Sequence, residues 1–347
     1  MDIGWFKELF DDIFSEYLRT CIAHTKAVTK NNRIDAIRDH LFAIATAGGK
    51  RIRPYCVYMW YKLYGGKDND AIMRFAVITE LLHTMALVHD DIMDESTKRH
   101  NIPTIHSYLQ TQDTRISRRI AEWQAILVWD LLLAWVYDLL HTTHLWFDLD
   151  HLLQAQQTIH TMIQEVIAWQ MLDIDLSIGD AVDLETLERK NLYKTARYSF
   201  AQPLLAGAQL AWADQSQQIL IMKLWEQLGI AYQIRDDLLD VLEFETDKNT
   251  FADVQEGQQT YLTYYIKTSG TQAQKNLLQQ HMGQQLNSSN IVELKQMFFE
   301  SGAIDFAKAK MTEHIAHAHS LLNQLTIVDD AMLSPLHALL SKFEKFN

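Results

Sequence analysis

The sequence predicts an all-α protein, a single domain over residues 1–347 that is built as a bundle of long helices. Apolar residues recur at steps of three and four along most of the chain, which is the period of an amphipathic helix. Only four prolines and twelve glycines interrupt the 347 residues, whereas many short strands would need frequent breakers. No alternating apolar and polar run is long enough to build a sheet.

The expected helices follow from this periodicity and from the few residues that break it. Gly48 and Gly49 permit a tight loop, and Pro54 suits the first turn of the helix after it. The stretch from Gln255 to Gln285 is rich in Gln and Thr, which is typical of a solvated surface with short helices. In chain order we expect long helices over residues 3–28, 33–46, 53–64, 70–93, 113–144, 149–177, 199–211 and 215–244.

Composition limits the classes of function. The formal net charge of −13 argues against general nucleic-acid binding, which needs a basic surface. Two cysteines, Cys21 and Cys56, show no metal or disulfide pattern and suit a reducing cytosol. The most apolar run, residues 125–140, is short for a bilayer and contains two aspartates, and no signal peptide begins the chain. We therefore expect a cytoplasmic protein without an integral membrane segment.

The stretch LVHDDIMDES, residues 87–96, places carboxylates at the end of an apolar helical face. Asp90 lies about five turns after Ile72 at ~3.6 residues per turn, so the two share a face. Asp94 lies one turn further on, and Asp91 lies beside Asp90. Carboxylates are rarely buried without a partner, and neighbouring like charges oppose each other's ionisation. Mg²⁺ would remove both problems, because it favours carboxylate oxygens together with phosphate. For this motif alone, a solvated helix end is the better explanation.

The same spacing returns in YQIRDDLLDV, residues 232–241, at Asp236, Asp237 and Asp240. The apolar side of the helix before it again leads to the first aspartate. Two inward-facing acidic motifs on separate long helices are much harder to explain as solvated helix ends. If the helices face each other, the carboxylates line one cavity that suits several Mg²⁺ ions and a polyanion, most simply a diphosphate.

Basic residues lie beside these acidic motifs. In AGGKRIRPY, residues 47–55, Lys50, Arg51 and Arg53 stand at the start of a helix, where exposed N–H groups favour anions. Solvated charges at an ordinary helix start explain this segment equally well. Other basic residues follow the acidic motifs or precede a threonine in YKTARY, and their positions favour anion binding: Arg99, Lys194 and Lys248.

Together these motifs resemble the trans-isoprenyl diphosphate synthases, the family that includes farnesyl and geranylgeranyl diphosphate synthases. The resemblance runs from residue 48 to about Thr260 and includes, in order, GGKRIRP, LLHTMALVHDDIMD, SxxRxxxPT, QMLD, KTA and YQIRDDLLD. It implies helices around a deep central cavity, in a homodimer. It also implies a head-to-tail prenyltransferase that condenses isopentenyl diphosphate with an allylic diphosphate.

The resemblance further implies two diphosphate sites. The allylic diphosphate would share two or three Mg²⁺ ions with the acidic motifs, whose implied metal ligands are Asp90, Asp91, Asp94, Asp236, Asp237 and Asp240. Its phosphates would contact Arg99, Lys194 and Lys248. Isopentenyl diphosphate would bind without metal to Lys50, Arg53, His83 and His100. Thr195 and Gln233 would lie near the reacting carbons and complete the implied catalytic set of Asp90, Asp91, Asp94, Lys194 and Asp236.

The chain departs from the family pattern at several positions. Where the family usually has two arginines and a glycine after the first motif, this chain has Arg99, His100 and Asn101. After the second motif, Gln258 replaces a lysine. Tryptophans stand where small residues are usual, at Trp129 and Trp169. These departures leave room for altered substrate binding or lowered activity.

Residues one turn upstream of the first acidic motif predict the product length. The growing chain should run along this helix away from Asp90, past Met85 and Ala86, with Leu82 deeper. Two bulky aromatics would limit the product and two small residues would let it run, whereas methionine is intermediate and flexible. We expect a C20 product, with C15 as the next choice.

Three other functions compete with this interpretation. A head-to-head synthase such as squalene synthase also has two acidic motifs, but the residues that flank them here fit the chain-elongating family better. A class I terpene cyclase also uses an all-helical cavity and an acidic motif, but its second metal site usually has a mixed Asn, Ser and Glu pattern. A catalytically weak partner subunit of a heteromeric synthase is the alternative without activity of its own. Such subunits typically lose aspartates from the acidic motifs, whereas this chain keeps all six.

We expect His100 to make isopentenyl diphosphate binding weaker and more dependent on pH than arginine would. Histidine is largely neutral near pH 7 unless an anion raises its pKa. The substitution His100→Arg should therefore lower the apparent KM for isopentenyl diphosphate in steady-state assays at neutral pH. An unchanged apparent KM would contradict this expectation.

Overall fold

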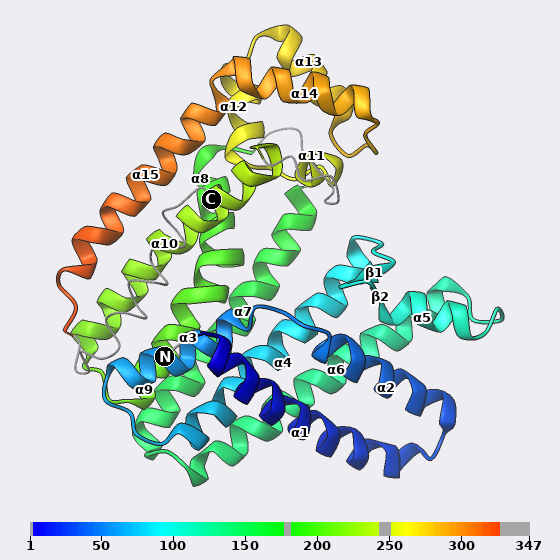
Figure 1. Ribbon diagram of the computed structural model, residues 1–347, viewed down its shortest axis with the longest axis vertical. Coiled ribbons are helices and arrows are strands. Elements are labelled where there is room, and N and C mark those ends of the chain that lie inside the picture. Colours follow the sequence, from blue (N-terminus) through cyan, green and yellow to red (C-terminus); the bar gives the residue numbers. More distant parts are fainter. Residues whose placement is uncertain (1–2, 177–181, 243–250, 327–347) are drawn as a thin grey trace. The chain divides into compact units, whose positions relative to one another are not determined.

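The computed structural model confirms the all-α fold class and describes residues 3–176, 182–242 and 251–326 (Figure 1). The described residues fall into two compact units. Unit 1 lies within Met1–Gln156 and Ala206–Trp212, and unit 2 lies within Gln157–Leu205 and Ala213–Ile327. The single domain over residues 1–347 stays a prediction.

Unit 1 contains the N-terminal helices and one short hairpin. Its strands β1 (Lys98–Arg99) and β2 (Ile102–Pro103) pair antiparallel directly after the first acidic motif. Its helices are α1 (Ile3–Thr29), α2 (Asn32–Thr46), α3 (Ile52–Leu63), α4 (Asn69–Met93), α5 (Ile105–Gln112), α6 (Arg118–Thr142), the 3-10 helix η1 (Thr143–Leu145), and parts of α7 (Leu149–Leu176) and α9 (Gln202–Leu210).

Helix α4 forms the core of unit 1 and carries the first acidic motif. It is buried on most sides and packs against α3 and α6. Its first turn is capped by Asp68, whose side chain accepts a hydrogen bond of 3.0 Å from the backbone N–H of Ala71. The helix ends at Met93, so Asp90 lies in its last turn and Asp94 just beyond it.

A buried arginine joins three helices of unit 1. Arg51 precedes α3 in the left-handed backbone region, with φ of 50°. Its guanidinium pairs with Glu80 of α4, and its Nε donates to Asp11 of α1 at 2.7 Å. A buried guanidinium is tolerated because both carboxylates compensate its charge. Arg51 therefore faces the core, unlike the solvated basic residue that a helix start would suggest.

Two helices of the described residues are long and apolar enough to cross a bilayer. The apolar window of Asn69–Met93 is 78% buried, as in the core helix of a soluble protein, whereas that of Arg118–Leu145 is 39% buried. The difference arises because one face of α6 packs on α4 and the other presents apolar side chains to the exterior of unit 1.

Unit 2 places the second acidic motif on a long helix surrounded by shorter ones. Its central helix α10 (Gln215–Leu242) packs against a π-helix, η2 (Asn191–Ala201), and against α15 (Ala303–Leu322). Its other helices are α8 (Leu184–Lys190), α11 (Ala252–Gln255), α12 (Tyr261–Ser269), α13 (Gln272–His281) and α14 (Ser288–Ser301), with parts of α7 and α9.

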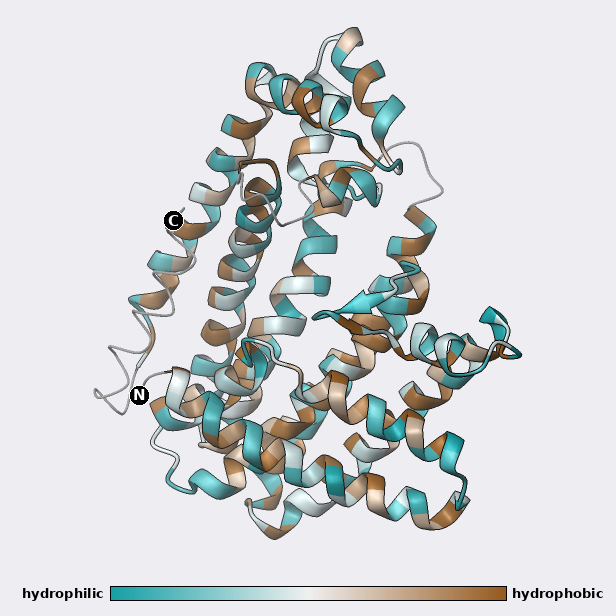
Figure 2. Cartoon of the chain, turned by 45° about the vertical axis from the view of Figure 1, so that its right-hand side comes forward, coloured by the Kyte–Doolittle hydropathy of each residue, from teal (hydrophilic) through white to brown (hydrophobic). Residues whose placement is uncertain are grey.

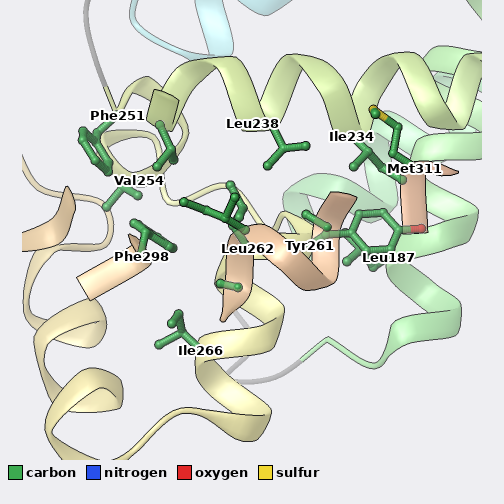
Figure 3. Close-up of a cluster of buried hydrophobic side chains, with 14 of the residues drawn as sticks. Leu187, Ile234, Leu238, Phe251, Val254, Tyr261, Leu262, Ile266, Phe298 and Met311 are labelled. Carbon is green, nitrogen blue, oxygen red and sulfur yellow. The ribbon is translucent and has the colours of Figure 1, made fainter. Parts of the chain in front are cut away.

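A hydrophobic cluster holds these shorter helices against α10. Figure 3 shows Ile234 and Leu238 pointing from α10 toward Tyr261 and Leu262 of α12. Figure 2 shows hydrophilic and hydrophobic residues interleaved along the helices, as expected where each helix buries one face. The stretch predicted as solvated surface therefore includes buried residues, because α12 contributes this apolar face to the core.

Two predicted helix ranges are wrong at their boundaries. The range 113–144 begins too early, because residues 113–117 separate α5, which the prediction missed, from α6, which begins at Arg118. Ser117 caps α6 by accepting a hydrogen bond of 3.4 Å from the backbone N–H of Ile120. The range 199–211 is preceded by helical backbone, because η2 already begins at residue 191 and continues into α9. A π-helix has wider turns than an α-helix, so its apolar residues depart from the usual period. The other long helices agree to within one residue wherever the structure describes their ends.

The contact between η2 and α10 depends on Gly229. An added Cβ at this glycine would lie 2.4 Å from the Cα of Ala196, closer than carbon atoms can approach. We expect Gly229→Ala to lower the free energy of unfolding by about 1–3 kcal/mol, because overpacking a close helix contact forces the backbones apart.

Urea unfolding measures this change. Gly4→Ala is the matched control, since Gly4 is an exposed residue of α1 where alanine suits a helix at least as well. Equal stability of the Gly229→Ala variant and the unsubstituted protein would refute the close contact.

Candidate functional site

A pocket of about 300 Å³ in unit 1 gathers most of the basic residues that the sequence singled out. We call it the basic pocket. Gly48 and Gly49 form part of its wall with φ of 137° and 115°, a backbone region that favours glycine. Around them the structure brings together the predicted residues Lys50, Arg53, His83, Arg99 and His100.

The electrostatics of the basic pocket favour an anion. Burial lowers the pKa of His83 well below its ordinary value, and the surrounding cations, led by Arg53 and Arg99, lower it further. An imidazole among positive charges stays neutral because a further proton would add to the repulsion. A bound anion would reduce this repulsion, so the pocket has the charge of a diphosphate site.

The first acidic motif divides into buried and accessible carboxylates. Asp91 is 3% exposed, and one of its oxygens accepts a hydrogen bond of 2.8 Å from Nε of Arg99 and lies 2.8 Å from Nη2 in an ion pair. Asp90 is partly exposed and Asp94 is exposed. The pair therefore fixes β1 to the end of α4 and leaves Asp90 and Asp94 on the accessible side of the motif.

A second pocket, of about 160 Å³, lies in unit 2 and contains both lysines and carboxylates. We call it the mixed-charge pocket. Two predicted site residues meet in it across η2 and α10, because Thr195 Oγ1 donates to Gln233 Oε1 at 2.7 Å. The amide nitrogen of Gln233 donates in turn to Asp237 at 2.7 Å. Its lining includes Lys190, Asn191, Lys194, Thr195, Gln233, Asp237, Asp253 and Gln258.

The second acidic motif repeats the division seen in the first. Asp237 is buried beside Gln233, whereas Asp236 is exposed. Asp240 accepts hydrogen bonds from the backbone N–H groups of Ala252 and Asp253 at 3.0 and 3.2 Å, so it also caps the start of α11. This capping role was not predicted, because residues 252–253 lie far from the motif in sequence.

Burial and the crowding of carboxylates raise the pKa values of two aspartates in the mixed-charge pocket. Burial raises the pKa of Asp237 well above its ordinary value, and Asp253 and Asp236 raise it further. Burial and the charge of Asp240 likewise raise the pKa of Asp253 to about 7. A cation would favour the ionised forms by reversing this repulsion.

The residues of this region that were missed as site residues include Lys190, Asn191, Asp173 and Asp253. The carboxylate of Asp173 on α7 accepts from Lys190 and Lys194 at 2.8 and 2.6 Å, and both lysines lower its pKa against the effect of burial. The available signal was the position of Lys190 four residues before Lys194, one helical turn away.

The unusual tryptophans each stack on a ring beside a predicted site residue. Trp129 of α6 stacks on His89 in unit 1, with ring centres 4.5 Å apart. Trp169 of α7 stacks on Tyr193 in unit 2, with ring centres 5.1 Å apart. The stacking gives each bulky residue a packing role where the resemblance leads one to expect a small side chain.

The carboxylates by themselves form no complete metal cage. Within residues 3–176, 182–242 and 251–326, no three His, Cys, Asp or Glu side chains converge on a metal position. Lys248 lies outside the described residues. The two motifs lie in separate units, and their facing each other stays a prediction.

Comparisons with known proteins identify the family. The family model for polyprenyl synthetase matches residues 34–298. The geranylgeranyl diphosphate synthase of Sulfolobus acidocaldarius is 27% identical over 92% of this chain and 94% of its own. The geranylfarnesyl diphosphate synthase of Aeropyrum pernix is 26% identical over 85% of this chain and 89% of its own.

The fold matches solved structures as well. A geranylgeranyl pyrophosphate synthase from Corynebacterium glutamicum, solved with isoprenyl diphosphate and magnesium, superposes with a TM-score of 0.86 over 100% of both chains, at 23% identity. The chain belongs to the polyprenyl synthetase family. It is accordingly a prenyltransferase of the head-to-tail, trans-isoprenyl class, which confirms the resemblance inferred from the motifs.

The depressed pKa of His83 predicts how stability depends on pH. A histidine that stays neutral in the folded protein takes up a proton when the protein unfolds. The folded protein therefore loses stability as pH falls below 6.5, the ordinary pKa of histidine. Between pH 6.5 and 5.5 this contributes a loss of roughly 1 kcal/mol. His83→Gln should remove that part of the pH dependence.

Urea unfolding at both pH values, in buffers without phosphate or sulfate, measures the effect. His24→Gln is the control, because His24 is an exposed histidine of α1. The assignment fails if both variants keep the full decline in stability of the unsubstituted protein.

Proposed function

We propose that this prenyltransferase is a short-chain synthase that elongates an allylic diphosphate with isopentenyl diphosphate, mainly to a C20 product. The observation that carries the proposal is the presence of two pockets of different charge. The basic pocket is dominated by cations, whereas the mixed-charge pocket combines lysines with the second acidic motif. The two substrates need this difference, because one diphosphate must be held intact while the other must leave.

Isopentenyl diphosphate is assigned to the basic pocket. Lys50 and Arg53 would hold its phosphates by charge, and His100 would add a weaker contact. His83, kept neutral by its surroundings, can donate one hydrogen bond without adding a charge. No carboxylate of the acidic motifs lines this pocket among the described residues, so binding without metal suits it.

The allylic diphosphate is assigned to the acidic motifs and the mixed-charge pocket. Hard carboxylate oxygens are the donors that Mg²⁺ prefers, and the crowded Asp237 and Asp253 favour a cation, so the donor set fits this ion. Asp90, Asp94 and Asp236 have the accessible carboxylates that would share two or three ions with the diphosphate. Mg²⁺ would neutralise charge on the leaving diphosphate.

The remaining residues of the proposed site would contact the substrate or hold a residue that does. Lys194 and Arg99 would contact the allylic phosphates, as would Lys248. Asp91 would keep Arg99 in place through their ion pair. The Thr195 hydroxyl and the Gln233 amide would lie near the reacting carbons, where their dipoles stabilise the allylic cation before the double bond of isopentenyl diphosphate attacks it. The proton then lost would go to the released diphosphate.

The proposed product length rests on the buried face of α4. Met85 and Leu82 are buried and Ala86 is partly buried. In this proposal the intermediate side chain of Met85 ends the path of the growing product. The named relatives include both geranylgeranyl and geranylfarnesyl diphosphate synthases, and the methionine favours the shorter of these two products.

We also propose a cytoplasmic homodimer that covers the exposed face of α6. Apolar and aromatic side chains follow one stripe of this helix, and Trp123 is 52% exposed. A contiguous apolar stripe on a soluble protein indicates an interaction surface. The stripe includes Ile120, Trp123, Leu127 and Tyr137.

An elongation assay with purified protein tests the proposal. Labelled isopentenyl diphosphate is supplied with dimethylallyl, geranyl or farnesyl diphosphate, with Mg²⁺ or with EDTA. We expect Mg²⁺-dependent elongation to C20, and a loss of about a hundredfold or more in Asp90→Ala and Asp236→Ala. Asp39→Ala is the control, because Asp39 is an exposed residue whose carboxylate pairs with Lys26.

Each other outcome has a defined meaning. Hydrocarbon formed from the allylic substrate alone would indicate a cyclase, and no turnover with any primer would favour a partner subunit. A longest product other than C20 would refute the role of Met85. Sedimentation of the same preparation as a monomer would refute the homodimer.

A further inference from the structure

Lys190 is a buried cation on the wall of the mixed-charge pocket. It is the last residue of α8 and only 8% exposed. Its ammonium lies 2.8 Å from an oxygen of Asp173 and 2.8 Å from the amide oxygen of Gln258. Within the described residues, these contacts use two of the three N–H donors that a lysine offers. A buried lysine is costly unless compensated, so its retention in a pocket calls for a role.

The neighbouring Asn191 provides a second, independent observation. Its side chain is 4% exposed and lines the same pocket, yet its Nδ2 finds no acceptor among the residues that the structure describes. Buried amide donors are nearly always satisfied, and an exception marks a place where a ligand can accept the hydrogen bond. In this pocket the missing acceptor is the kind of atom that a phosphate carries.

A spacing of four residues brings these donors together. Lys190, the last residue of α8, stands about one helical turn before Lys194, and Asn191, the first residue of η2, stands about one turn before Thr195. The shared carboxylate of Asp173 confirms that the two ammonium groups lie close together, because it pairs with both.

The contact with Gln258 indicates what Lys190 replaces. Gln258 is neutral, and it stands where the family resemblance places a second lysine after the acidic motif. The ammonium of Lys190 donates to the amide oxygen of this residue, and both residues line the pocket. The chain thus keeps a positive charge at this point of the pocket, but Lys190 supplies it in place of residue 258.

We propose that Lys190 and Asn191 are further binding residues of the mixed-charge pocket, where they join Lys194 in holding the diphosphate group of the allylic substrate. Lys190 supplies the positive charge that Gln258 lacks, and Asn191 donates to a phosphate oxygen. This inference deepens the proposed function and rests on its assignment of the allylic diphosphate to this pocket. The alternative is that Lys190 serves only to neutralise Asp173.

Two variants separate these roles by moving the positive charge from residue 190 to residue 258. Lys190→Met removes the ammonium and keeps an unbranched side chain of similar length. Lys190→Met combined with Gln258→Lys returns the ammonium from the other side of the 2.8 Å contact. Lys310→Met is the matched control, since Lys310 is an ion-paired lysine of unit 2 that does not line the pocket.

Calorimetry with inorganic pyrophosphate and Mg²⁺ measures binding, and steady-state assays measure KM for each substrate. We expect Lys190→Met to weaken pyrophosphate binding by roughly tenfold or more, the usual effect of losing a charged hydrogen bond. The KM for the allylic diphosphate should rise similarly, while that for isopentenyl diphosphate stays within about twofold. The double variant should recover most of the affinity. Asn191→Ala should weaken binding by a smaller factor.

The results distinguish failure of this inference from failure of the proposed function. Unchanged pyrophosphate affinity in Lys190→Met, or a loss that Gln258→Lys does not restore, would overturn the inference even if elongation is normal. An equal rise in both KM values would overturn the assignment to the allylic group. The unsubstituted protein could bind pyrophosphate through Lys190 and yet elongate no primer. That result would refute the proposed elongation activity, while the anion-binding site would stand. Should Lys190→Met not fold, Asn191→Ala decides by the same binding measurement.

Discussion

A carboxylate at the buried end of an apolar helix must be compensated, and the candidate site follows from this constraint. Asp91 on α4 is compensated by Arg99, whose ion pair also fixes the hairpin that follows the helix. Asp237 on α10 is only partly compensated by the amide of Gln233, and burial together with its acidic neighbours raises its pKa. The second motif therefore retains an unmet demand for positive charge, which a divalent cation satisfies better than a single side chain.

The two pockets differ in the sign of the charge that a bound group would have to supply. In the basic pocket burial lowers the pKa of His83 and the surrounding cations lower it further, and in the mixed-charge pocket burial raises the pKa of Asp253 and the neighbouring carboxylates raise it further. The first arrangement favours an anion alone, whereas the second favours an anion together with a cation. A reaction between two diphosphates in which only one diphosphate departs needs this asymmetry, since charge neutralisation promotes departure.

The close approach of η2 to α10 positions the chemistry of unit 2. Gly229 and Ala196 allow the two backbones to come together, and this contact brings Thr195 within hydrogen-bonding distance of Gln233. Lys190 at the end of α8 and Asn191 at the start of η2 line the same pocket. Irregular helical geometry is common at functional sites because it directs side chains to positions that a regular α-helix does not offer.

The sequence by itself determined the long helices, the spacing of both acidic motifs and the residues of the basic pocket. Each of these depends on local periodicity or on short motifs, which adjacent residues specify. Tertiary structure alone decided that Arg51 faces Glu80, that Asp240 caps α11 and that Lys190 meets Gln258. It also decided the break between α5 and α6 and the π-helical turn of η2. These features depend on partners far away in the chain, whose approach is set by packing and charge compensation and leaves no periodic trace in the sequence.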